Sequence, residues 1–174
     1  MNYLIIGGSK SGKSDKAEHI AKELSPGKII YVATMKPYDD EDKKRIENHR
    51  RKRLGFNFIT IEQSRNINEI LQYIKNDDTV LIDSITSLLT NEMFIGNDII
   101  KNPSKNIIKG LKQIMSKAQN TIIVSDYIFN DSILYDEISE NFKKELGIIN
   151  CESAVLCENV IECTFGSYKY HKRL

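Results

Sequence analysis

Eight residues near the N-terminus have the types and the spacing of a phosphate-binding loop. Residues 7–14 read GGSKSGKS, which fits the pattern G-x-x-x-x-G-K-[ST]. In this pattern the glycines let successive backbone N–H groups turn towards an anion, the lysine reaches the β- and γ-phosphates, and the serine hydroxyl can ligate Mg²⁺. A glycine-rich turn could match by chance, but the chain has a short apolar run before the loop and helical spacing after it, as the motif requires. We expect a nucleoside triphosphate to bind at Gly7, Gly8, Ser9, Lys10, Ser11, Gly12, Lys13 and Ser14.

A histidine within a basic run is the second candidate for chemistry. Residues 45–53 read RIENHRRKR, and five of these nine side chains belong to lysine or arginine. The run could be the solvated face of a helix or a patch for nucleic acid, although a net charge of +1 for the chain weakens the second interpretation. The third interpretation is a triphosphate clamp, in which neutral His49 attacks an α-phosphorus and the arginines neutralise charge on the phosphate oxygens.

The third candidate is a carboxylate at the end of an apolar run. Asp83 follows the sequence TVLI at residues 79–82, as the acidic residue of a Walker B strand does. Many strands end in aspartate simply because it suits turns. Together with the P-loop, however, Asp83 and Ser14 are the expected oxygen ligands of Mg²⁺.

The composition indicates one ordinary globular domain spanning residues 1–174. Apolar residues make up 40% and charged residues 28%, and the net charge gives no sign of a nucleic-acid partner. The three cysteines leave one unpaired in any disulfide scheme, which favours a reduced, cytoplasmic setting. No apolar stretch has the length of a signal peptide or of a membrane-spanning helix.

Short apolar runs alternate with segments of helical spacing along the chain. Strands are predicted at residues 3–6, 29–33, 58–62, 79–82 and 121–124, and helices at 15–24, 67–74, 107–115 and 135–149; residues 84–94 are expected to form a helix, or a helical turn followed by a loop. Residues 39–53 could form a mostly solvated helix, 96–104 are expected to be a loop, and 155–170 a terminal hairpin around Gly166. This alternation predicts an α/β fold with a mostly parallel sheet, helices on both faces and an antiparallel C-terminal edge.

The fold predicts where the chemistry should lie. In open α/β sheets, binding sites lie beyond the carboxyl ends of the strands. Gly7, Thr34, Asp83 and Asp126 each stand just past the end of a predicted strand. We therefore expect these residues to converge on one edge of the sheet.

Several runs together resemble one known family. They are GGSKSGKS at 7–14, YVAT at 31–34, YDDEDKKRIENHRRKR at 38–53, TIE at 60–62 and LIDSITSLLTNEMF at 81–94. These runs are similar to those of the bifunctional adenosylcobinamide kinase/adenosylcobinamide-phosphate guanylyltransferases of cobalamin biosynthesis. The resemblance is strongest over residues 3–94. It implies a P-loop NTPase fold with RecA-like topology, which in this family is typically a homotrimer.

The resemblance also implies an activity and the residues that carry it. One reaction phosphorylates adenosylcobinamide with GTP or ATP; the other transfers GMP from GTP, through a guanylylated histidine, to give adenosylcobinamide-GDP. The expected catalytic residues are His49, Lys13 and Asp83. Further residues of the nucleotide site would be Ala33 and Thr34 at a strand end, and Arg50, Arg51, Lys52, Arg53 and Glu62 around the guanine nucleotide.

The chain departs from the family pattern after residue 120. The usual Asn-Glu-Val-Gly is replaced by SDYIF at residues 125–129, and Glu140 stands where an arginine is expected. Phe142, Gly147 and Asn150 still match the pattern. Two alternatives follow: a P-loop kinase with a single activity on a small molecule, or a nucleotide-binding paralogue without transfer chemistry.

Overall fold

The core of the molecule is a seven-stranded sheet. The computed structural model describes residues 1–25, 27–37, 47, 51, 57–128 and 133–174. The strands are β1 (Asn2–Gly7), β2 (Ile29–Ala33), β3 (Phe58–Glu62), β4 (Thr79–Asp83), β7 (Asn120–Asp126), β8 (Asn159–Thr164) and β9 (Ser167–Lys172). Their order is β3-β2-β4-β7-β1-β8-β9, and every neighbouring pair is parallel except β8 and β9. The expected α/β class, with its antiparallel C-terminal edge, is confirmed.

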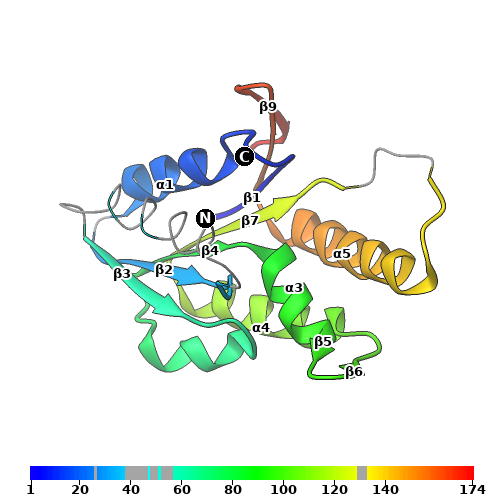
Figure 1. Ribbon diagram of the computed structural model, residues 1–174. Helices are drawn as coiled ribbons and strands as arrows, with labels where there is room; N and C mark the ends of the chain where they lie inside the picture. The colour runs from blue at the N-terminus through cyan, green and yellow to red at the C-terminus, as the bar shows by residue number, and fades with distance from the viewer. Residues whose placement is uncertain (26, 38–46, 48–50, 52–56, 129–132) are drawn as a thin grey trace.

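Helices cover both faces of this sheet (Figure 1). They are α1 (Lys13–Leu24), the 3₁₀ helix η1 (Ile67–Tyr73), α3 (Ile85–Met93), α4 (Ser104–Lys117) and α5 (Glu137–Leu156). Apolar residues of α1 pack into one buried cluster, and those of η1, α3, α4 and α5 pack into another. Neighbouring strand residues divide between the two: Ile82 belongs to the second cluster and Leu81 to the first. Both faces are therefore buried, which explains why the central strands read as continuous apolar runs.

Three predicted segments differ from the structure. The helix expected at 67–74 is a 3₁₀ helix, and residues 96–104 are not simply a loop. They contain part of a small antiparallel hairpin, β5 (Phe94–Ile95) with β6 (Asp98–Ile99), before α4 begins at Ser104. Helix α5 continues past the predicted end at residue 149 to Leu156, and in this extension its buried residues include the polar Asn150 and Ser153, so the apolar spacing does not mark the helix end. Most of the helix considered at 39–53 lies outside the described residues. Within this range Glu47 and Arg51 are described, and both are helical.

The start of α5 gives Glu140 a role. The Asp136 carboxylate accepts hydrogen bonds from the backbone N–H groups of Ile138 and Ser139, each at 3.0 Å, and so caps the helix. Hydrogen bonds from the backbone and hydroxyl of Ser139 lower the pKa of Asp136. One residue earlier, the N–H of Tyr135 donates to the Glu140 carboxylate at 3.2 Å. The acidic residue at 140 therefore helps to fix how the chain enters the helix.

Candidate nucleotide site at the carboxyl edge of the sheet

The loop between β1 and α1 has the backbone of an anion cradle. Strand β1 ends at Gly7 and helix α1 begins at Lys13. Gly12 and Lys10 both have positive φ angles, of 89° and 57°, which bend the loop back over the helix N-terminus. The first backbone N–H groups of α1 have no partner within the helix, and the helix dipole favours an anion at this end. This geometry supports the expected phosphate site.

Lys13 is held at the bottom of the loop. Its ammonium Nζ lies 2.6 Å from Oδ1 of Asp126 and donates to the Gly8 carbonyl at 3.0 Å, and the residue is 8% exposed. Nearby, the Ser11 hydroxyl is buried, and no described residue offers it a hydrogen-bond partner. A buried polar group without a partner is costly unless something else fills its hydrogen bonds. A phosphate oxygen in the loop would supply that partner.

Asp83 is positioned by the neighbouring strand β2. The Tyr31 hydroxyl donates to Oδ2 of the Asp83 carboxylate at 2.9 Å. The Thr34 hydroxyl accepts from the Ser84 N–H at 2.8 Å and donates to the Ser84 carbonyl at 2.7 Å. The Asn91 amide reaches from α3 to the Thr34 carbonyl at 2.9 Å. These contacts fix the ends of β2 and β4 relative to each other and hold the carboxylate at the sheet edge.

The four strand-end residues converge as predicted. Gly7 is in register with Asp126, and the Tyr127 N–H donates to the Gly7 carbonyl at 3.1 Å. The Thr34 N–H donates to the Asp83 carbonyl at 3.2 Å. Strand β7 lies between β1 and β4, so Asp126 stands between the P-loop and Asp83. All four residues therefore belong to the carboxyl edge of one sheet.

Two residues of this edge have contacts that the sequence does not predict. Asp126 is expected at the edge, but its ion pair with Lys13 is not, because the pair depends on β7 lying beside β1. Tyr31 is expected only as a strand residue, although its hydroxyl binds Asp83. In each case the available signal is a polar group within or at the end of an apolar run.

The C-terminal hairpin closes one side of the loop. The Lys16 ammonium lies 5.0 Å from the centre of the Tyr168 ring, a cation–π contact between α1 and β9. Cys163 of β8 lies beside Gly7 in the sheet, and burial raises the pKa of its thiol. Burial also raises the pKa of Cys157 to about 12. Thiols held in the protonated form are poor nucleophiles, so neither cysteine is a candidate for nucleophilic attack.

Gly7 and Gly8 provide a test of how tightly the loop is built. A Cβ added at Gly7 would lie 2.5 Å from the Cys163 carbonyl oxygen and from the Ser11 hydroxyl, whereas one added at Gly8 would meet nothing within 4 Å. Gly7→Ala should therefore lower the free energy of unfolding by about 1–3 kcal/mol, the usual cost of overpacking. Gly8→Ala should change it by less than about 0.5 kcal/mol. Urea unfolding of the nucleotide-free proteins measures both; equal effects would contradict this geometry.

Comparison with known proteins identifies the family. The model of the family described as cobinamide kinase / cobinamide phosphate guanyltransferase matches residues 3–169. The chain belongs to this family. A bifunctional adenosylcobalamin biosynthesis protein CobU of Escherichia coli is 31% identical over 127 residues, 72% of this chain and 67% of that protein. A bifunctional adenosylcobalamin biosynthesis protein CobP of Pseudomonas aeruginosa is 28% identical over 162 residues, 92% of this chain and 91% of that protein.

Solved structures support the fold. A protein of Pyrococcus horikoshii superposes with a TM-score of 0.55 at 11% identity, covering 99% of this chain and 86% of that one. A solved ATPase domain superposes with a TM-score of 0.54 at 15% identity, covering 92% of this chain and 68% of that one. At these identities the likeness shows a common P-loop NTPase fold and no more.

The family determines the class of enzyme. The chain is a transferase of the kinase/guanylyltransferase type in cobalamin biosynthesis. An enzyme of this class uses a nucleoside triphosphate, and the P-loop at the carboxyl edge of the sheet is the part of the described structure that suits one. No helix in the described part of the chain is long and apolar enough to cross a membrane.

The structure places the other predicted site residues unevenly. Ser14 lies half-buried in the first turn of α1, and Ala33 ends β2 beside Asp83. Glu62 ends β3, which lies four strands away from β1 on the same edge. Arg51 is exposed and pairs with Glu47, the Nε to Oε1 distance being 3.5 Å. Outside the described residues lie His49, Arg50, Lys52 and Arg53.

Proposed function

We propose that this chain phosphorylates adenosylcobinamide and then transfers GMP from GTP to the product through a guanylylated His49. The observation that carries the proposal is an assembled triphosphate loop in the same chain as a histidine within a basic run. A kinase needs the first of these features and not the second. Membership of the family supports both activities.

The proposed activity consists of a kinase step and a guanylyl transfer. In the kinase step the alcohol oxygen of adenosylcobinamide attacks the γ-phosphorus of the triphosphate, the nucleoside diphosphate leaves, and the alcohol proton is released. In the second reaction a ring nitrogen of His49 attacks the α-phosphorus of GTP, and pyrophosphate leaves. A phosphate oxygen of adenosylcobinamide phosphate then attacks the same phosphorus and releases the histidine, which yields adenosylcobinamide-GDP.

The described residues have matching roles at the carboxyl edge. Backbone N–H groups of the P-loop would hold the phosphates, and Lys13 would turn its ammonium from Asp126 towards the β- and γ-oxygens. Ser14 and Asp83 supply hard oxygen ligands, which suits Mg²⁺, because this ion usually takes one or two protein ligands and completes its shell with phosphate and water. Bound there, Mg²⁺ would neutralise charge on the phosphates.

A kinase with a single activity is the second candidate. The observation in its favour is the altered segment after β7, in which Glu140 binds the N–H of Tyr135 where the family carries an arginine. An acidic side chain there repels phosphate instead of binding it. A homotrimer and a cytoplasmic location remain proposals from the family resemblance.

Labelling with GTP tests the proposed function. Incubated with Mg²⁺ and GTP labelled at the α-phosphate, the purified chain should retain label through denaturation, in an acid-labile and base-stable form. Adenosylcobinamide phosphate should then discharge that label. A chain that binds GTP and never acquires label would overturn the guanylyl transfer and favour the kinase with a single activity.

Asp83→Asn tests the metal role of the sheet edge. The amide keeps an oxygen that accepts from Tyr31 but removes the negative charge that binds Mg²⁺, so turnover should fall about a hundredfold and need more Mg²⁺. Asp77→Asn is the matched control, because Asp77 is exposed just before the start of the same strand. The measurement is nucleoside diphosphate release against Mg²⁺ concentration. An unchanged Mg²⁺ requirement in Asp83→Asn would show that the metal is held elsewhere.

A further inference from the structure

Helix α5 extends beyond the carboxyl edge of the sheet. Asn150, in its second half, accepts from the Ser125 hydroxyl at 2.6 Å and donates to the Asp126 carbonyl at 3.4 Å, so this part of the helix lies at the end of β7. Ile138 precedes Asn150 by twelve residues, which at 1.5 Å per residue is about 18 Å of helix. The first turns of α5 therefore project past the end of β7, as Figure 1 shows at the right of the molecule.

This projecting part forms a pocket with α3, which we name the α3–α5 pocket. Its volume is about 430 Å³, and its apolar lining comes from Phe94, Ile128, Ile138 and Phe142, with the ring of Tyr135. Phe94, Tyr135 and Ile138 remain between 41% and 44% exposed. Large apolar side chains that gather around a hollow in this way are typical of a ligand site.

Polar groups in the pocket make it suitable for a ligand of mixed character. Thr90 and Ser139 contribute hydroxyl groups, and Lys143 contributes an ammonium. That ammonium lies 4.9 Å from the centre of the Tyr135 ring and 3.7 Å from the Glu140 carboxylate. The Thr90 and Ser139 hydroxyls donate to the Thr86 carbonyl and to the Asp136 carboxylate, so towards a ligand they offer acceptor lone pairs, whereas the Lys143 ammonium is a donor.

The pocket adjoins the nucleotide site through two short connections. Ile128 follows Asp126 by two residues, which spans at most about 7 Å of chain. Thr86 accepts from the Asp126 N–H at 3.2 Å, and Thr90 lies one helical turn further along α3, its hydroxyl donating to the Thr86 carbonyl at 2.9 Å. A molecule in the pocket therefore has its end close to Asp126, whose carboxylate pairs with Lys13 at the base of the P-loop.

We propose that the α3–α5 pocket is the acceptor subsite and holds one edge of the corrinoid ring of adenosylcobinamide. A corrinoid carries methyl groups and amide side chains around a flat macrocycle; the methyl groups suit the apolar wall, amide N–H groups suit the two hydroxyls, and an amide carbonyl suits the Lys143 ammonium. The pocket is smaller than the whole ring, so the alcohol arm extends out of it towards the P-loop. This assignment rests on the proposed function, because it takes the acceptor to be a corrinoid.

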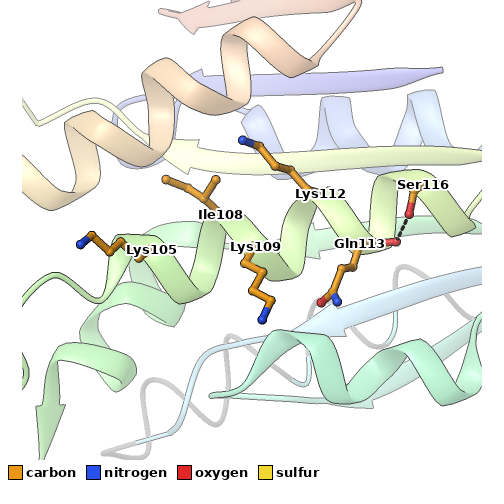
Figure 2. A pocket seen from close by; sticks show the side chains of 6 residues that line it. All are labelled: Lys105, Ile108, Lys109, Lys112, Gln113 and Ser116. Atoms are coloured by element: carbon orange, nitrogen blue, oxygen red, sulfur yellow. Dashed lines mark hydrogen bonds between the residues drawn. The ribbon is translucent and has the colours of Figure 1, made fainter.

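A second hollow lies on the surface of α4 and differs from the α3–α5 pocket in the residues that line it. Its six lining residues all belong to this one helix, and three of them are lysines (Figure 2). The side chains of Lys105, Lys109 and Lys112 leave the helix in different directions, and the Lys112 ammonium lies 3.3 Å from the Glu152 carboxylate of α5. This hollow has no second element to enclose a macrocycle, and we assign it no ligand.

Two isoleucines of α5 provide a matched pair for the test. Ile138 lines the pocket and is 44% exposed, whereas Ile148 lies on the same helix outside the pocket and is 38% exposed. Ile138→Glu should weaken corrinoid binding about tenfold or more, because it puts a carboxylate against an apolar ring edge. A glutamate in the first turn of a helix is favourable for the helix itself, so the variant should fold. Ile148→Glu should bind the corrinoid within about twofold of the wild type.

Equilibrium dialysis against adenosylcobinamide, read by corrinoid absorbance, measures this affinity. The affinity for a fluorescent GTP analogue, measured on the same samples, shows that each variant is folded. Loss of corrinoid binding in Ile138→Glu alone is the expected result. Equal corrinoid affinities in all three proteins would overturn the pocket assignment while leaving the proposed function intact. A wild type that binds GTP but no corrinoid would overturn the proposed substrate, and the subsite with it.

Discussion

Replacing Lys13 with alanine should lower the affinity for nucleoside triphosphate about a hundredfold or more. The Lys13 ammonium is the positive charge held at the base of the P-loop, 3.0 Å from the Gly8 carbonyl. Each charge-assisted hydrogen bond that it makes to a β- or γ-phosphate oxygen contributes about 1.5–3 kcal/mol, and two such bonds account for the expected loss. The variant also leaves the Asp126 carboxylate facing the loop without its cation, which adds repulsion. Titration with a fluorescent GTP analogue measures the change.

Lys22→Ala is the control for this experiment. Lys22 belongs to the same helix but lies in its last turn, about 14 Å from Lys13 along the axis. Its ammonium stacks over the Phe58 ring at 5.8 Å, so its removal changes charge without reaching the loop. Nucleotide affinity should stay within about twofold. A Lys13→Ala protein that binds as tightly as the wild type would refute the P-loop assignment, whatever the family.

The central strands could be predicted because strands that are buried on both faces consist mostly of consecutive apolar residues. Strand β2 reads IIYVA and strand β4 begins TVLI, as strands covered on both faces do. The P-loop was predicted for a similar reason, since its function depends on the types and spacing of adjacent residues. Features that depend on residues close together in the sequence can therefore be predicted without the structure.

Contacts that depend on the order of strands in the sheet cannot be predicted in this way. Lys13 and Asp126 are separated by most of the chain, and they meet only because β7 lies next to β1. Tyr31 reaches Asp83 only because β2 lies next to β4. The 3₁₀ form of η1 was missed because Ile67, Ile70 and Ile74 have a spacing that suits either kind of helix. The α3–α5 pocket depends on the position of the long helix α5 against β7, and no local sequence pattern predicts that position.

His49→Ala should abolish the covalent label that the wild type acquires from GTP labelled at the α-phosphate. Only a neutral nitrogen nucleophile gives an adduct that is labile in acid and stable in base, and alanine offers none. The basic residues on both sides of His49 in the sequence would offset the charge of the triphosphate. Denaturing gels of the labelled proteins, treated with acid or base, provide the measurement.

The two other histidines of the chain separate this assignment from a general effect of losing an imidazole. His19 is exposed on α1 beside Glu23, and His171 is exposed on β9, 2.7 Å from the Glu162 carboxylate. His19→Ala and His171→Ala should both retain the label. Label that persists in His49→Ala would place the nucleophile elsewhere in the chain. The expected result is loss of label in His49→Ala alone, with nucleotide affinity unchanged. It would show that His49 is needed for GMP transfer and not for binding, because the P-loop holds the triphosphate whether or not the histidine attacks it.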